Sequence, residues 1–553
     1  MDESELSRLT LGQLLDRQSA AFGDHACVAY PDRDVHFSYR QFHDRVDLIG
    51  RGLMSLGIRK AEHVAVWAPN VPEWLLLQFA IAKIGAILVP IPVDCVQDEL
   101  EHILRASETT TLFWHEPKTA GAGAMLHAIL PGLDDAPVGH GRFETLPRLS
   151  RLLVIGRDRL AGMLRFDDLH DLSVQTHPDD YRRRGEASDS FDVVALPFAG
   201  DGPGMPKGAM LNHRNLITNG WQAAARAGID DGDRVCIAVP FSHPLGFVTS
   251  SIGSIGRGAC MVPLADLESE AATGTIRQMG CSAVVAFPNS LAAIARSASG
   301  STAISAAGKG ITGALPVAHE LASALGAAFG SGLTFAFGSA EMTSVITQTA
   351  AGDDANRRAK TSGKVLPGVL ARVVDPHTGN AVAAGSVGEL WCRGQGMMKG
   401  YYKEPAATSR AIDAEGWYHS PYSATLDRDG YLTLVARRED PIARDGVAID
   451  PGEIESFLRG YPTVTQACAI GVPSKAVGEE VCAVVVTAPG EVASDAEIIG
   501  FCRGRLRDAC EPTLVMIVEA IPLTAEGAVN RRALRRAAIE RFGREEDAAV
   551  VTA

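Results

Sequence analysis

The chain has 553 residues, 46% of them hydrophobic, which is enough to bury cores in two or more domains. Its 66 acidic residues outnumber its 52 basic ones, and the formal net charge of −14 argues against nucleic-acid backbone binding as the main role, because that role needs a basic surface. The 10 cysteines form no C-x-x-C pair, so the sequence indicates thiols in a reducing compartment and neither a zinc site nor a disulfide framework.

The N-terminal part of the chain predicts helices and buried strands. Its acidic opening, MDESELSRLT, is unlike a secretory signal, so we expect a cytoplasmic protein. Segments 9–22 and 37–57 have the apolar spacing of amphipathic helices, and 63–69 has the composition of a short buried strand. The apolar stretch 71–93 is interrupted by polar residues, which predicts a buried helix running into a strand and no membrane insertion.

This alternation continues to about residue 365 and predicts an α/β architecture with parallel sheets. Two intervals, 116–146 and 177–190, are rich in small or charged residues and are expected to be surface connections. Short strands with turn residues predict a small β-rich subdomain over about 365–435. The remaining 436–553 have a helix–strand–strand–helix order, which predicts a small α+β domain separate from a large N-terminal domain over 1–435.

Five segments of the chain, in this order, resemble the adenylate-forming (AMP-binding) superfamily, in its acyl-CoA synthetase or fatty-acid–CoA ligase branch. They are 63–91, 205–220, 360–379, 387–408 and 452–486. The resemblance implies a mobile C-terminal domain, with the nucleotide and acyl sites between the two domains. It also implies ATP and Mg²⁺ as cofactors, CoA or an acyl thioester as a further ligand, and an acyl-type small molecule as substrate.

Enzymes of this family join a carboxylic acid to CoA in two half-reactions. The carboxylate attacks the α-phosphate of ATP to give acyl-AMP and pyrophosphate, and the CoA thiolate then displaces AMP. Such chemistry depends on positioning and on electrostatic stabilisation of the charge that gathers at the phosphate. The family residues that serve it have matching positions in this chain.

The family's phosphate-binding loop matches 198–208. Lys207, Gly204 and Gly208 keep the family's residues and are the expected nucleotide contacts. The family's hydroxyl positions are instead filled by Ala199, Gly200, Gly202 and Pro203, with Asp201 between them. A hydrogen bond to a charged group contributes about 1.5–3 kcal/mol, so these replacements predict weak ATP binding.

The family's adenine loop and magnesium glutamate match the segment that ends in Glu341. Glu341 is the expected Mg²⁺ ligand and a candidate catalytic residue, Gly338 keeps the turn, and Phe337 replaces the adenine-loop tyrosine. The ribose-binding aspartate is replaced by Tyr422, whose single hydroxyl cannot hold two ribose hydroxyls as a carboxylate does. Arg437 keeps the arginine that is often a second ribose contact.

The catalytic lysine of the family's C-terminal domain corresponds to Ala528, which supplies neither charge nor hydrogen bond. Loss of one preorganised donor lowers a rate by about 10²–10³. The arginines that follow are expected to face solvent: Arg531, Arg532, Arg535 and Arg536. His243 matches an aromatic or histidine position at the family's acyl pocket and is a candidate catalytic residue, with a packed core histidine as the alternative.

These replacements gather in the nucleotide-handling elements, while the scaffold segments are kept. We therefore expect an acyl-CoA synthetase-like protein with a degenerate adenylation site, a pseudoenzyme that binds an acyl chain or acyl thioester without ATP-dependent activation. A second reading is the transfer of a pre-activated acyl group, and a protein partner or carrier protein is a further expectation. The alternative is a functional ATP-dependent fatty or carboxylic acid–CoA ligase that forms an acyl-AMP intermediate.

Overall fold

The chain divides into two compact units in a computed structural model. Unit 1 comprises Met1–Ala199, Lys207–Ser420 and Ala424–Leu434, and unit 2 comprises Gly200–Pro206, Pro421–Ser423 and Val435–Ala553. The residues that the structure describes are 3–115, 122–156, 158, 160–200, 205–265, 267, 269–297, 307–314, 319–330, 332–376, 378–437, 442–445, 447–491, 493–524 and 527–543.

The larger sheet of unit 1 has nine strands, with six parallel strands at its centre and antiparallel strands at both edges. In spatial order they are β18 (Lys364–Val365), β17 (Thr347–Gln348), β16 (Gly332–Phe337), β15 (Lys309–Ala314), β14 (Ala283–Ala286), β12 (Arg234–Ala238), β13 (Cys260–Pro263), β1 (Ala26–Tyr30) and β2 (Val35–Ser38). Every residue of β14 (AVVA) and β13 (CMVP) is buried, as expected for parallel strands covered on both faces.

The second sheet of unit 1 has seven strands, of which all but the edge strand β11 are parallel. In spatial order they are β11 (Leu211–Asn212), β8 (Val193–Ala195), β4 (Ile87–Pro90), β3 (His63–Trp67), β5 (Thr111–Trp114), β6 (Arg151–Val154) and β7 (Leu164–Arg165). The side chains of Trp67 and Trp114 lie in the hydrophobic core that this sheet forms with its helices.

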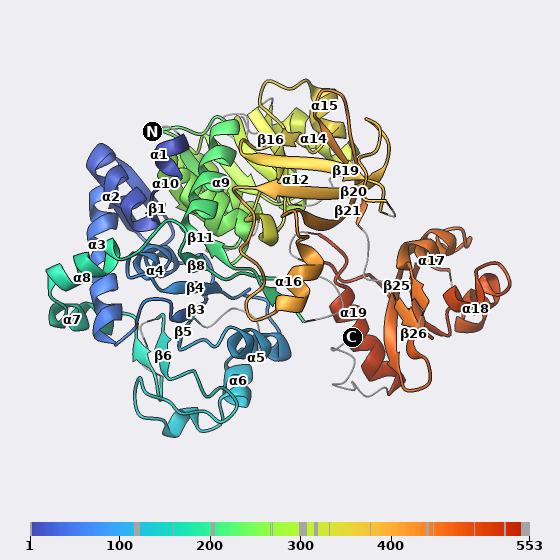
Figure 1. The fold of residues 1–553 in the computed structure, drawn as a ribbon, viewed down its shortest axis with the longest axis horizontal. Helices are drawn as coiled ribbons and strands as arrows, with labels where there is room; N and C mark the ends of the chain where they lie inside the picture. The colour runs from blue at the N-terminus through green and yellow to red at the C-terminus, as the bar shows by residue number, and fades with distance from the viewer. Residues whose placement is uncertain are drawn as a thin grey trace. The chain divides into compact units, whose positions relative to one another are not determined.

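Helices cover these two sheets (Figure 1). They are α1 (Glu3–Leu6), α2 (Leu11–Phe22), α3 (Tyr39–Ser55), α4 (Pro72–Lys83), α5 (Gln97–Ala106), α6 (Ala122–Ile129), α7 (Asp168–Leu172), α8 (Pro178–Glu186), α9 (His213–Arg226), α10 (Gly253–Arg257), α11 (Ser269–Met279), α12 (Pro288–Ser297), α14 (His319–Phe329), α15 (Ala355–Lys360) and α16 (Pro405–Ala411). Helices α2, α3 and α9 begin with capping boxes, in which the N-cap residue and the third helical residue each accept a backbone N–H from the other.

The apolar stretch 71–93 forms a buried helix and a strand, as its sequence predicts. Helix α4 buries all its residues except Glu73, because apolar side chains surround the helix on every side. Gly85, with φ at +70°, ends the helix before β4. Among the described helices, none is both long and apolar enough to cross a bilayer.

Two intervals expected to be surface connections contain helices instead. Residues 116–146 include α6, whose Leu126 is fully buried. Residues 177–190 include α8, which lies beside α3 (Figure 1). Tyr181 of α8 packs where Gly50 of α3 has no side chain, since a Cβ on Gly50 would lie 2.6 Å from the tyrosine ring. The prediction failed because the single apolar side chain of α8 gives no helical periodicity.

Two smaller β structures lie wholly or mostly in unit 1, with residues 421–423 and 435–437 of the first belonging to unit 2. Four strands form a separate sheet in the order β19 (Val369–Val374), β20 (Gly388–Gly394), β21 (Tyr418–Leu426) and β22 (Leu432–Arg437). A two-stranded antiparallel pair is formed by β9 (Phe198–Ala199) and β10 (Lys207–Gly208).

Unit 2 is a small α+β fold with its own cores. Its sheet runs β24 (Val447–Ile449), β23 (Ile442–Arg444), β26 (Gly478–Thr487) and β25 (Val464–Ser474), with β27 (Leu514–Ile517) parallel to β26. Its helices are α17 (Pro451–Leu458), α18 (Asp495–Cys502) and α19 (Arg531–Phe542). The parallel α/β sheets, the β-rich part and this small unit confirm the fold class predicted from the sequence.

Candidate functional site

The strand pair β9–β10 carries the two ends of the expected phosphate loop. Lys207 in β10 is half-buried and pairs in register with Ala199 in β9. A Cβ at Gly208 would lie 2.9 Å from a neighbouring leucine side chain, so glycine suits this position. Residues 201–204, which include the expected contact Gly204, lie outside the described residues. The structure thus defines the lysine end of the loop.

The segment that carries Glu341 leaves the parallel strand β16 through a strained turn. A Cβ at Gly338 would lie 1.6 Å from the Ser344 carbonyl oxygen, so only glycine fits there. Thr343 has φ 75° and ψ −60°, and the Ser344 N–H donates to the Met342 carbonyl at 3.0 Å. This is the rare, strained form of γ-turn. Such strain persists where the surrounding structure holds it, and it clusters at functional sites.

The Glu341 side chain is held by a tyrosine that the sequence reasoning missed. Tyr401 Oη donates to Glu341 Oε1 at 2.9 Å, and the Met398 N–H donates to the Glu341 backbone carbonyl at 2.8 Å. The next residue, Tyr402, donates its N–H to the Gly208 carbonyl of β10 at 2.8 Å. The segment with Tyr401 and Tyr402 therefore contacts both Glu341 and the phosphate-loop strand β10. This segment lies within 387–408, which resembles the family, and that resemblance was the sequence signal that could have pointed to it.

His243 lies two residues before a π-helix, η3 (Leu245–Ile252), with Pro244 as the N-cap between them. Its Nδ1 accepts the Leu245 N–H at 3.1 Å, so the neutral ring carries its proton on Nε2, and its ring meets Phe287 edge-on at 5.1 Å. Thr249 Oγ1 hydrogen-bonds Ser344 Oγ at 2.7 Å, which links η3 to the γ-turn beside Glu341. π-helical segments are rare and frequent at functional sites.

Three expected nucleotide contacts lie on strands. Phe337 is the buried last residue of β16. Tyr422 is 5% exposed in β21, on the same face as Tyr418 because alternate residues of a strand point the same way. Arg437 ends β22, and its side chain lies outside the described part of the chain. Their roles as nucleotide contacts stay predictions.

The backbone of Ala528, in unit 2, is hydrogen-bonded to Thr524. Its N–H donates to Thr524 Oγ1 at 3.2 Å, and its carbonyl accepts the Thr524 N–H at 2.7 Å. Gly527, with φ at +93°, allows the chain to turn there. The residue at the catalytic-lysine position is therefore fixed by its backbone.

The expectation that the arginines after Ala528 face solvent is wrong for two of them. Arg531 is 7% exposed, pairs with Glu455 at 2.7 Å and donates to the Ala469 carbonyl at 2.8 Å. Arg535 pairs with Glu479 at 2.6 Å. These contacts hold α19 against α17 and the sheet of unit 2, and the helix sequence alone does not reveal these partners.

No group of three or more His, Cys, Asp or Glu side chains that could hold a metal ion occurs among the described residues. A magnesium ion used with a nucleotide is commonly held by one or two carboxylates together with the substrate's phosphates. One half-buried carboxylate, that of Glu341, on the segment joined to the phosphate-loop strand fits such an ion.

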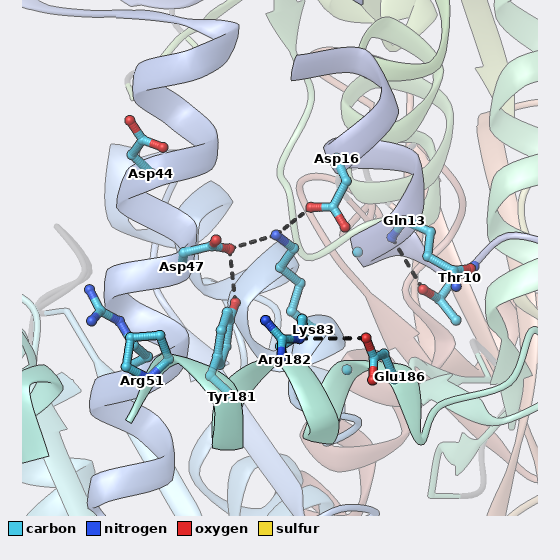
Figure 2. Close-up of a pocket in the computed structure, with 13 residues that line it drawn as sticks. Thr10, Gln13, Asp16, Asp44, Asp47, Arg51, Lys83, Tyr181, Arg182 and Glu186 are labelled. Atoms are coloured by element: carbon cyan, nitrogen blue, oxygen red, sulfur yellow. Dashed lines mark hydrogen bonds and ion pairs between the residues drawn. The ribbon is translucent and has the colours of Figure 1, made fainter. Parts of the chain in front are cut away.

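A cavity of about 720 Å³ opens between α2, α3, α4 and α8, and Figure 2 shows its lining. Lys83 Nζ lies 2.6 Å from Asp16 Oδ1 and 2.5 Å from Asp47 Oδ1, and Tyr181 Oη donates to Asp47 at 3.0 Å. None of the site residues expected from the sequence lines this cavity. The ion pairs of Lys83 join α2, α3 and α4, and the Tyr181 hydrogen bond adds α8.

Known proteins match nearly the whole chain. The AMP-binding enzyme family model matches residues 15–402, and the AMP-binding enzyme C-terminal domain model matches 453–528. The "Putative acyl-CoA synthetase YngI" of Bacillus subtilis is 34% identical over 98% of this chain and 99% of its own. The mitochondrial medium-chain acyl-CoA ligase ACSF2 of Mus musculus is 27% identical over 96% of this chain and 88% of its own. The anthranilate CoA ligase AuaEII, solved with anthranoyl-AMP, has the same fold, with a TM-score of 0.73 at 22% identity over 98% of this chain and 100% of its own.

These matches contradict the interpretation of the sequence as a degenerate, non-adenylating protein. Relatives that align along nearly the whole chain are named as an acyl-CoA synthetase and an acyl-CoA ligase, which favours the alternative of a functional ATP-dependent ligase. The doubt about ATP and Mg²⁺ has no support either. The interpretation treated each replaced side chain as a separate loss, but effects within one constellation are not additive, and backbone N–H groups also bind phosphate.

Proposed function

The chain belongs to the AMP-binding enzyme family, and we propose that it is an ATP-dependent carboxylic acid–CoA ligase that forms an acyl-AMP intermediate. The observation that carries this proposal is the gathering of Glu341 and strand β10 around Tyr401 and Tyr402, just beyond the carboxyl end of the parallel strand β16. In open α/β sheets, ligands bind outside the carboxyl ends of the strands.

In the first half-reaction an oxygen of the substrate carboxylate attacks the α-phosphorus, and the bond from that phosphorus to the pyrophosphate oxygen breaks. Lys207 places a cation at the phosphates, and Glu341 would hold Mg²⁺ there. Bound magnesium neutralises negative charge on the phosphate oxygens. In the second half-reaction the CoA thiolate attacks the acyl carbon, and AMP leaves with the electron pair of its phosphate oxygen.

Among the family side chains that are replaced, Ala528 and Tyr422 stand at the catalytic-lysine and ribose positions, and we expect these two replacements to affect the rate and not the reaction type. Ala528 supplies no cation, so adenylation relies on Lys207 and Glu341. Tyr422 offers the ribose one hydroxyl in place of a carboxylate. Since one preorganised donor changes a rate by about 10²–10³, this ligase should be slower than the same chain with lysine at position 528.

The surroundings of His243 support an apolar acid as the substrate. Phe241, Leu245 and Phe247 are buried, and Trp74 stacks on Phe241 at 5.1 Å. The relative ACSF2 is named a medium-chain ligase, which supports fatty acids of that class. The ten cysteines are buried thiols, which supports a reducing compartment, and we propose the cytoplasm.

ATP–pyrophosphate exchange over a panel of fatty and aromatic acids tests the proposal. We expect exchange that requires both an acid and Mg²⁺, and release of AMP when CoA is added. Glu341→Gln should lower the exchange rate by about 10²-fold. Glu320→Gln, which changes an exposed carboxylate on α14, is the matched control and should leave the rate unchanged. Wild-type protein that exchanges with none of the acids would overturn the proposal.

A further inference from the structure

The backbone on both sides of Tyr401 is fixed. Its N–H donates to Thr408 Oγ1 at 2.9 Å, and it forms a β-bridge with Ala209. Gly400 before it has φ at +140°, and a Cβ there would lie 2.8 Å from the Thr408 side chain. The backbone of Tyr401, which carries the phenol, is therefore held by Ala209, the residue directly after β10, and by Thr408.

The Glu341 carboxylate, to which the Tyr401 phenol donates, has few other restraints. Glu341 lies on the 3₁₀ turn η4 (Ala340–Met342), next to the strained Thr343. Within the described residues, the carboxylate forms no ion pair and accepts no second hydrogen bond besides that of Tyr401 Oη. The terminal torsion of a glutamate is broad, so one hydrogen bond decides how its two oxygens are oriented.

We propose that Tyr401 is a positioning residue for Glu341. By holding Oε1, the Tyr401 phenol leaves Oε2 in a fixed orientation for Mg²⁺, and it couples that carboxylate to the phosphate-loop strand through the β-bridge to Ala209. The proposal rests on the ligase function proposed above. It assigns to the kept family segment 387–408 a role in aligning the cation with the phosphates.

Tyr401→Phe, which removes only the hydroxyl, tests this role. Tyr181→Phe is a matched control, because it also removes a tyrosine–carboxylate hydrogen bond, that to Asp47, but in the cavity between helices. Calorimetric titration with ATP at a series of Mg²⁺ concentrations measures binding without turnover. We expect Tyr401→Phe to need about tenfold more Mg²⁺ for half-maximal tightening of ATP binding, while Tyr181→Phe keeps the wild-type concentration.

A double-mutant cycle separates positioning from stability. In a Glu341→Gln background the added Tyr401→Phe should change neither the Mg²⁺ dependence nor the exchange rate further, because the positioned carboxylate is already gone. If Tyr401→Phe keeps the wild-type Mg²⁺ dependence, the positioning role is overturned while the ligase function stands. If wild-type protein itself shows no Mg²⁺-dependent ATP binding, the ligase function fails, and the role of Tyr401 fails with it.

Discussion

His213 predicts a pH dependence of the stability of unit 1. It is the first residue of α9 and is 1% exposed, and its Nδ1 accepts the N–H of Leu11, the first residue of α2, at 3.1 Å. That N–H has no partner within its own helix. Burial, opposed by Asp192 and Asp189, lowers the pKa of His213 from 6.5 to about 4. A proton on His213 Nδ1 would point at the Leu11 N–H, so two donors would face each other and the hydrogen bond would be lost.

The sign and size of the change in the free energy of unfolding follow from proton linkage. As pH falls through 6.5 the unfolded chain takes up a proton that the folded chain refuses until about pH 4, so the free energy of unfolding falls across that window. Relative to pH 7.5, the loss from His213 is about 2 kcal/mol at pH 5 and about 3 kcal/mol once fully developed. His213→Asn keeps an acceptor oxygen at the Nδ1 position and removes the titration.

Tryptophan fluorescence during guanidinium unfolding gives the readout, because all six tryptophans lie in unit 1: Trp67, Trp74, Trp114, Trp221, Trp391 and Trp417. Between about pH 7.5 and pH 5, wild type should lose about 2 kcal/mol more than His213→Asn. His170→Asn, at an exposed position on α7, should follow wild type. Equal losses for wild type and His213→Asn would refute the reasoning.

Replacing Lys83 by methionine removes the ammonium group that pairs with Asp16 and Asp47, so the free energy of unfolding of unit 1 in guanidinium should fall by about 1–3 kcal/mol. An unchanged unfolding midpoint would mean that these ion pairs contribute nothing to stability. Replacing Gly338 by alanine puts a Cβ 1.6 Å from a carbonyl oxygen, so thermal melting should shift to lower temperature and Mg²⁺-dependent exchange should be lost; full activity would contradict the geometry. Replacing Ala528 by lysine should raise the ATP–pyrophosphate exchange rate by about 10²-fold, with Ala528→Gln as the uncharged control; equal rates for the two variants would exclude a role for charge there.

The parts of the fold that the sequence predicts correctly are those whose signal is local. The run that forms α4 and β4 is long and apolar, and length and polar interruptions decide between a buried helix and a membrane span. Helix α8 was missed because its stability comes from Tyr181 packing against Gly50, 131 residues earlier in the chain, and from charges that also suit a loop. Arg531 was misplaced for the same reason, since its partner Glu455 lies on α17.

In the candidate site, too, the sequence predicts features with a local signal and misses those that depend on distant contacts. Motif comparison locates Lys207 and Glu341, because both keep the family's residue types. It does not reveal that Tyr401, 60 residues from Glu341, holds that carboxylate, because hydrogen bonds across such separations depend on tertiary packing. Nor does it reveal the burial of Tyr422, which depends on which face of β21 is covered.

The turn beside Glu341 bears on whether the site still works. Thr343 is β-branched and holds a φ of 75°, a conformation that costs about 1–3 kcal/mol, offset in part by the hydrogen bond that its Oγ1 donates to the Gly396 carbonyl at 2.6 Å. A glycine at position 343 would relieve most of that strain. A chain with no use for the position of Glu341 would gain stability from such a change. The strained turn, with Gly338 and Tyr401 fitted around it, therefore supports the proposal that the Glu341 carboxylate serves the reaction.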